Sequence, residues 1–231
     1  MTAAPPPSAE QPSQVAWLVS RAALPDETLP ITANAADGGA LIDNLVKDGF
    51  TAEAMRVLAS ALPPREGVWW AWAAARYSTQ HPTAGVAKPG IIEALDATEK
   101  WIALPDDTNR RASWAASEVA GLDTAAGCAA AATFFTAGSI APAELAVIPP
   151  PPGIHTTLVS TAVLMSAMVN PDQLDSFAAA YIAQGVEVVK QIGGWEKSVA
   201  LAKAHFDAQA DQQAKAKAAA EPAGKSASAT S

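Results

Sequence analysis

The sequence predicts an all-α protein, a compact irregular bundle of about seven to nine short helices. Apolar residues recur at three- and four-residue spacing, as on helix faces, and no stretch shows the alternation of a convincing strand. Proline and glycine interrupt the chain at intervals of about one helix length. Half of the 231 residues are hydrophobic, and many of these are alanines. Such small side chains let helices pack closely, and the short connections favour antiparallel neighbours.

Helix-breaking and capping residues divide the first half of the chain. Pro25 ends the first helix, and Gly49 forms the turn of a helical hairpin whose second helix has Thr51 as N-cap. Pro64 and Pro89 each suit the first turn of a helix. The predicted helices of this half cover residues 39–48, 51–62, 64–78 and 89–104, and residues 15–23 are a candidate for one further short helix.

The second half is divided in the same way. Asp106 or Asp107 caps one helix, Thr124 caps the next, and the Gly193-Gly194 pair separates the last two. The predicted helices cover residues 107–121, 125–136, 156–170, 172–192 and 195–220. The helix over 125–136 has no charged residue on any face, so we expect it at the centre of the bundle. The helix over 64–78 is also expected to be enclosed on most sides.

The expected domain organisation is one helical domain, residues 14–208, between two disordered tails. The N-terminal tail, 1–13, and the C-terminal part, 209–231, are rich in alanine, proline and serine. The last helix loses its apolar stripe near 208 and is expected to fray beyond it. A Pro-rich crossover, 141–153, contains four consecutive prolines. We interpret this run as a rigid connection rather than a docking ligand, because sequence typical of folded protein flanks it.

Charge and hydropathy narrow the range of partners and locations. The net charge is -8 and there is no dense cluster of lysine and arginine, which argues against a nucleic-acid partner. The most apolar stretch, 158–169, is too short to cross a bilayer, so no membrane insertion is expected. The N-terminus lacks the basic and apolar regions of a signal peptide, and the expected location is therefore cytoplasmic.

No catalytic, metal or cofactor motif is present in the sequence. Cys128 is the only cysteine and lies in a run of alanines, which is typical of a small buried side chain. His81, His155 and His205 are on different segments and have no spacing typical of metal ligands. We therefore expect no metal, no cofactor and no enzymatic activity.

The strongest local signal is a group of aromatic residues around one arginine. On a helix, Trp69, Trp70 and Trp72 fall on the same arc as Arg76, and the rest of that helix is also apolar. We therefore expect Arg76 to be buried. A buried guanidinium cannot lose its proton and needs a carboxylate or a set of carbonyl groups as its partner.

Two carboxylates are candidate partners for Arg76. Glu99 flanks the apolar face of the helix over 89–104, beside Trp101. Glu118 follows Trp114 by one turn on the next helix, and Arg111 points in nearly the same direction. We expect a buried polar cluster of Arg76, Glu118 and either Glu99 or Arg111. It either fixes the register of the helices or forms a pocket for a ligand or partner.

One pattern in the sequence resembles that of a known family. Trp69-Trp70, Arg76, Glu99-x-Trp101, Pro105, Arg110-Arg111, Glu118 and the prolines 149–152 carry the resemblance. The chain resembles an uncharacterised bacterial family of alanine-rich helical proteins found in the company of type VI secretion genes. The likeness covers residues 50–192, and Trp72 departs from the less aromatic segment usual in that family.

The resemblance transfers no catalytic residue. It implies an accessory role in the bacterial cytosol, as adaptor or chaperone for a secretion apparatus or its effectors. Together with the missing catalytic motifs, this predicts a non-enzymatic interaction protein with a protein partner. The alternative prediction is a small-molecule-binding protein or enzyme with a Trp/Arg-lined pocket, formed by Trp69, Trp72 and Arg76, for an anionic ligand.

Overall fold

The computed structural model describes residues 13–81, 89–142 and 144–220, and in these residues every regular element is helical. The all-α prediction is confirmed, but the eleven α-helices exceed the expected seven to nine. The helices are α1 (Gln14–Ala22), α2 (Leu29–Thr32), α3 (Gly38–Lys47), α4 (Thr51–Ala61), α5 (Pro64–Thr79), α6 (Pro89–Ala103), α7 (Asp107–Ala120), α8 (Ala125–Phe134), α9 (Ile154–Ala167), α10 (Leu174–Ile192) and α11 (Trp195–Ala220).

Capping residues set most of the predicted boundaries. The Asp106 carboxylate accepts a hydrogen bond from the Asn109 amide at the start of α7, and Thr124 Oγ1 accepts one from the Gly127 amide at the start of α8. The prediction for Thr51 is wrong, because Phe50 is the N-cap of α4 and makes no side-chain cap. The single-turn helix α2 was not predicted, since four residues are too few to show a period.

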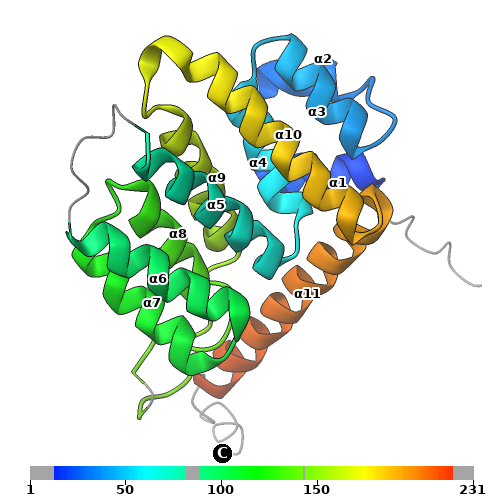
Figure 1. Cartoon of the computed structure of the whole chain (residues 1–231). Coiled ribbons are helices and arrows are strands. Elements are labelled where there is room, and N and C mark those ends of the chain that lie inside the picture. Colours follow the sequence, from blue (N-terminus) through cyan, green and yellow to red (C-terminus); the bar gives the residue numbers. More distant parts are fainter. Residues whose placement is uncertain (1–12, 82–88, 143, 221–231) are drawn as a thin grey trace, which may run out of the picture.

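Helix α8 lies at the centre of the part of the bundle that α5 to α9 form (Figure 1). It packs against α5, α6, α7 and α9. Every residue from Ala126 to Phe134 is buried, including Cys128. The predicted central position of this helix is confirmed, and so is the burial of its cysteine. A helix enclosed on all sides must be apolar all round, which is what the alanine run provides.

Helix α5 buries one face and exposes the other. Trp70 is fully buried, and its indole Nε1 donates a hydrogen bond to the Tyr181 carbonyl oxygen at 2.9 Å. Trp69 and Trp72 are half-buried, whereas Arg76 and Tyr77 are exposed. The expectation that this helix is enclosed on most sides is therefore correct for residues 67–75 and wrong for its two ends, where Arg65, Arg76 and Tyr77 are exposed.

The apolar interior forms one large cluster and one small one. The large cluster includes residues from Trp17 on α1 to Phe206 on α11, whose rings meet edge to face at 5.7 Å between centroids. The small cluster lies between α5, α6, α7 and α8 and is formed mainly by alanines: Ala75, Ala94, Leu95, Ala120, Ala126 and Ala130.

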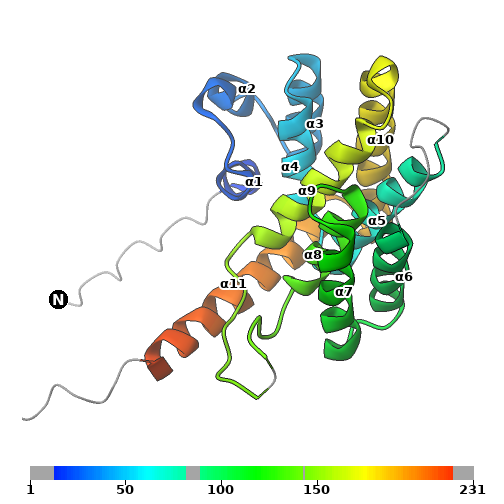
Figure 2. The same ribbon diagram turned by 90° about the vertical axis from the view of Figure 1, so that its left-hand side faces the viewer.

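The predicted tails lie mainly outside the described residues, which exclude 1–12 and 221–231. Ser13, assigned to the N-terminal tail, is instead the N-cap of α1 and accepts a hydrogen bond from the Ala16 amide. Helix α11 remains helical to Ala220, and Figure 2 shows it running beyond the rest of the bundle. The predicted domain end at 208 is too early, because Gln209 is buried.

Candidate functional site

Arg76 is a surface residue, so the predicted burial of this side chain is wrong. Its side chain is 48% exposed and pairs with Glu99, which is 52% exposed, at 3.2 Å between Nη1 and Oε2. Its guanidinium also lies over the Trp72 ring, 5.1 Å from the centroid. Glu99 is thus the carboxylate partner of Arg76, but the ion pair is half exposed to solvent. The helical wheel placed Arg76 on the same face as Trp72 correctly, but that face is open to solvent at Arg76.

The other members of the predicted cluster are separated. Glu118 is exposed on α7, and the carboxylate that Arg76 meets is that of Glu99. Trp101 is buried in the large apolar cluster. Trp69 lines a separate groove of about 240 Å³ with Arg65, Glu66, Ile102, Val188 and Gln191. The predicted residues therefore do not form one site: Arg76 stays with Trp72 and Glu99, and Arg111 stays with Trp114.

The buried arginine is Arg110, which was named above only within the Arg110-Arg111 pair and was not predicted to be a site residue. Its side chain is 3% exposed. Nε and Nη2 donate to Asp107 Oδ1 at 2.9 and 2.6 Å, Nη1 donates to the Phe134 carbonyl at 2.6 Å, and Nη2 also reaches the Ser139 carbonyl at 2.9 Å. This network supplies the carboxylate and the carbonyl groups that a buried guanidinium needs.

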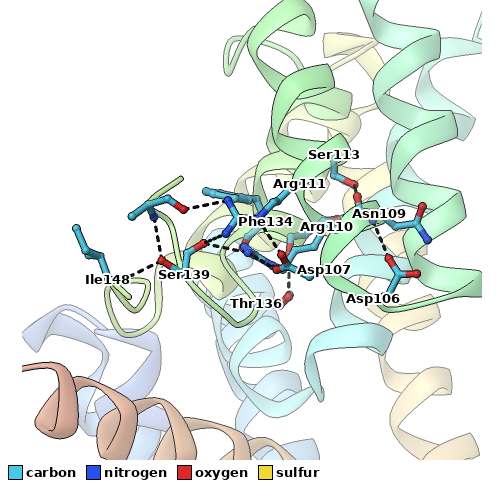
Figure 3. Close-up of polar contacts among 12 residues, drawn as sticks. Asp106, Asp107, Asn109, Arg110, Arg111, Ser113, Phe134, Thr136, Ser139 and Ile148 are labelled. Atoms are coloured by element: carbon cyan, nitrogen blue, oxygen red, sulfur yellow. Dashed lines mark hydrogen bonds and ion pairs between the residues drawn. The ribbon is translucent and has the colours of Figure 1, made fainter. Parts of the chain in front are cut away.

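Arg111 extends the same network towards solvent (Figure 3). Its Nε donates to Asp107 Oδ2 at 2.8 Å, Nη1 to the Ala141 carbonyl at 3.0 Å and Nη2 to the Ser139 carbonyl at 3.2 Å. Hydrogen bonds from Arg111 and then Arg110 hold the pKa of the Asp107 carboxyl below its usual range. The sequence signal was Asp107 in the first turn of a helix, three and four residues before two arginines.

Two of the three carbonyl groups that these arginines bind, those of Ser139 and Ala141, belong to the connector, residues 135–153 between α8 and α9. Gly138 has φ of +73°, and a Cβ atom there would lie 3.0 Å from Arg110 Nη2. The position therefore suits glycine, both for its left-handed backbone and for the space that the guanidinium takes. Without a side chain at 138, the connector can lie directly on Arg110.

The connector folds back on itself after it leaves the arginines. The Ile140 amide donates to the Ile148 carbonyl at 2.8 Å. Ser139 Oγ accepts hydrogen bonds from the Ile148 and Ala141 amides at 3.1 and 3.2 Å. Leu145, Val147 and Ile148 are held in this loop with exposed fractions of 60%, 64% and 53%. An ordered loop that presents three aliphatic side chains to solvent is typical of an interaction surface.

A pocket of about 430 Å³ lies between α7, the end of α8 and the connector. It is lined by Arg111, Trp114, Phe134, Phe135, Ile140 and Pro142. The rings of Trp114, Phe134 and Phe135 contact one another, with centroids 5.0 to 5.6 Å apart. Aromatic walls with one guanidinium at the edge suit an apolar group that carries or adjoins a negative charge. We call this space the aromatic pocket.

Two histidines that are far apart in the sequence meet between α9 and α11. His155 on α9 is buried, and its ring centroid lies 5.2 Å from that of His205 on α11. His155 Nδ1 and His205 Nε2 have no hydrogen-bond partner in the part of the chain that the structure describes. Burial, with the nearby His205, lowers the pKa of His155 to about 3, and burial also lowers the pKa of His205.

Cys128 and the remaining ionisable groups form no further site in the described ranges. Burial, with a contribution from Asp123, raises the pKa of the Cys128 thiol to about 11, so the reactive thiolate is disfavoured. In the residues that the structure describes, no three histidine, cysteine or carboxylate side chains are grouped so that they could hold a metal ion. None of the described helices is both long and apolar enough to cross a membrane.

Comparison with known proteins identifies a family and no individual relative. No curated protein is similar in sequence, and no solved structure is similar in fold. A family model does match residues 41–189, which begin within α3 and end within α10, so α1 and α11 lie outside the matched range. By this match the chain belongs to the family of unknown function DUF6931.

Proposed function

We propose that this protein is a non-enzymatic interaction protein that binds a partner protein through the aromatic pocket and the connector loop beside it. The observation that carries the proposal is the exposure of Leu145, Val147 and Ile148 on a loop that hydrogen bonds hold in place. Exposed apolar side chains beside an aromatic pocket offer the apolar centre that partner-binding surfaces need. Because the loop is held before binding, little conformational entropy is lost when a partner docks.

The finer part of the proposal is the biological setting. The resemblance to alanine-rich helical proteins found with type VI secretion genes suggests an adaptor, chaperone or accessory component of a bacterial secretion apparatus, acting in the cytoplasm. This part rests on association with the family rather than on a mechanism. The identity of the captured partner therefore tests it separately from the binding surface.

The test is a quantitative affinity purification of the tagged full chain from its native cell. Leu145→Glu with Val147→Glu places two charges on the loop without removing any of its hydrogen bonds. Leu29→Glu, on α2, is the matched control because Leu29 is also exposed, at 50%. We expect a stoichiometric partner with wild type and the control, reduced at least about tenfold with the loop variant. Equal recovery with all three proteins would contradict the proposal.

A second candidate function is the binding of a small anionic ligand in the aromatic pocket. It is favoured by the Arg111 guanidinium at the edge of a pocket whose volume, about 430 Å³, is in the range of small-molecule sites. The Trp/Arg pocket expected at Trp69, Trp72 and Arg76 is replaced here by one at Trp114 and Arg111.

Thermal-shift measurements with a panel of aromatic carboxylates test this second candidate. A ligand at saturating concentration should raise Tm by several degrees, since binding to the folded state adds about 2.7 kcal/mol at 100 times Kd. The increase should be lost with Arg111→Gln and kept with Arg76→Gln, a surface arginine outside the pocket. No shift with any carboxylate would remove this candidate.

A further inference from the structure

Helix α11 binds the connector near both of its ends. Gln209 Nε2 donates to the Thr136 carbonyl at 3.0 Å and approaches the Phe135 carbonyl at 3.5 Å. One turn later, Gln213 Nε2 donates to the Pro150 carbonyl at 2.8 Å. Figure 2 shows α11 passing beside the segment between α8 and α9. One helix therefore spans the two points at which the connector leaves α8 and approaches α9.

Helix α7 binds the same connector at different points. Arg110 and Arg111 bind the carbonyl groups of Ser139 and Ala141, which follow the residues that Gln209 binds. Between these attachments lie Ile140 and Pro142, which line the aromatic pocket. The pocket wall on this side thus depends on two sets of hydrogen bonds, one from α7 and one from α11.

Beyond Phe206, helix α11 is only weakly attached to the rest of the fold. Phe206 is the last apolar side chain of the described α11 residues to be buried in the core, and Gln209 is the last buried residue of any kind. Four buried side-chain atoms have no hydrogen-bond partner in the described residues. Three of them lie where α11 meets α9 and the connector: His155 Nδ1, His205 Nε2 and Gln209 Oε1. Buried groups without partners disfavour the docked state, because water would satisfy them after separation.

We infer that residues 207–220 of α11, which follow the core residue Phe206, are a releasable strap that regulates the connector. With the strap docked, the connector is fixed at both ends and the wall of the aromatic pocket is set. With the strap released, the connector is held by α7 alone and its exposed loop gains freedom. The link to partner binding rests on the proposed function, whereas the strap itself does not. Helix α11 lies outside residues 41–189, which the family model matches. The proposed regulation of the connector by the strap therefore comes from a part of the chain beyond the matched residues.

Amide hydrogen exchange, followed by NMR on the free full chain, tests the strap. Gln209→Ala with Gln213→Ala removes the hydrogen bonds to the connector and retains a strong helix former at both positions. We expect the Ile140 and Ile148 amides, which close the loop, to exchange about tenfold faster or more. Amides of α8 between Ala129 and Thr133 should change less than about twofold, because the core is not altered.

Gln212→Ala is the matched control, since Gln212 is exposed on the same turn of α11. It should leave exchange at Ile140 and Ile148 unchanged. Unchanged exchange at both amides in the double variant, or equal acceleration in α8, would overturn the inference. The second result would mean that the glutamines stabilise the whole fold rather than a strap. The exchange experiment uses no partner, so unchanged exchange would not count against the proposed binding surface. Equal partner recovery with all three proteins in the affinity purification would likewise not count against the strap.

Discussion

At the scale of single residues, two arginines in this fold have opposite surroundings. Arg110 is enclosed and donates hydrogen bonds to a carboxylate and to two carbonyl groups. Arg76 lies in solvent, where its ion pair with Glu99 is half exposed. Exposed pairs of this kind contribute little to stability, whereas removal of one partner from a buried network leaves uncompensated polar groups.

The two arginines should therefore respond differently to the same substitution. We expect Arg110→Met to reduce the free energy of unfolding by about 2 to 4 kcal/mol, because Asp107 Oδ1 and the buried Phe134 carbonyl lose their donors while Arg111 keeps only Asp107 Oδ2. Arg76→Met should change it by no more than about 0.5 kcal/mol. Urea unfolding of both variants measures the difference. Equal losses would mean that Arg76 is buried in solution or that the Arg110 network does not form.

His155 makes stability depend on pH. Burial lowers its pKa in the folded protein from the ordinary 6.5 to about 3, so the unfolded chain takes up the proton first as pH falls. The contribution of neutral, buried His155 is complete above pH 6.5 and is lost progressively between pH 6.5 and 3. At about 1.4 kcal/mol per pH unit, the full loss is on the order of 5 kcal/mol.

This prediction is checked by the slope of unfolding free energy against pH. His155→Gln should reduce that slope most clearly between pH 6.5 and 5, above the range in which carboxylates with ordinary pKa values titrate. His205, whose pKa is also lowered, should leave a smaller residual slope. A variant that retains the full wild-type slope would show that His155 is accessible and titrates normally.

At the scale of helices, close approach depends on glycine at specific positions. A Cβ atom on Gly127, near the start of α8, would collide with the carbonyl oxygen of Gly121 at the end of α7. A Cβ atom on Gly67 in α5 would meet Leu62 and Val159 at 3.7 Å or more, which is ordinary contact. Alanine is favoured over glycine in a helix by about 1 kcal/mol, so only the surroundings distinguish the two positions.

The expected results therefore have opposite signs. Gly127→Ala should lower the free energy of unfolding by about 1 to 3 kcal/mol, since α8 or the turn before it must shift. Gly67→Ala should be neutral or raise it by up to about 1 kcal/mol. Thermal and denaturant unfolding of the pair give the comparison. Stabilisation by both substitutions would contradict the tight contact between α7 and α8.

Helix boundaries were predictable because their causes are local. Pro64, Asp106 and Thr124 act within one turn, so the starts of α5, α7 and α8 match the expected positions. The central position of α8 was also predictable, because a helix without charged residues has no face for solvent. A single helical turn in place of a loop, as at α2, leaves no comparable signal in four residues.

The candidate site was only partly predictable. Arg111 and Trp114 were identified, but the Arg110 network depends on contact between residues about 25 to 30 positions apart. The pairing of His155 with His205 spans 50 positions and has no local pattern at all. Helical periodicity gives the direction of a side chain, but not whether a neighbouring element covers it, and this accounts for the error at Arg76.

At the scale of the whole molecule, the fold combines a packed centre with a loop held on its surface. Helix α8 and its neighbours provide the rigid part, and Arg110, Arg111 and Gln209 fix the connector to it. The loop thereby presents Leu145, Val147 and Ile148 beside the aromatic pocket. We propose that a partner protein docks at this surface.

Site-specific photocrosslinking in the native cell tests that claim most directly. A photoreactive phenylalanine analogue is placed at Val147 in the loop or, as control, at Leu29 on α2, both of which are exposed. The account predicts one discrete crosslinked species from position 147 and none of that mass from position 29. No discrete species from position 147, or the same species from both positions, would contradict docking at the connector.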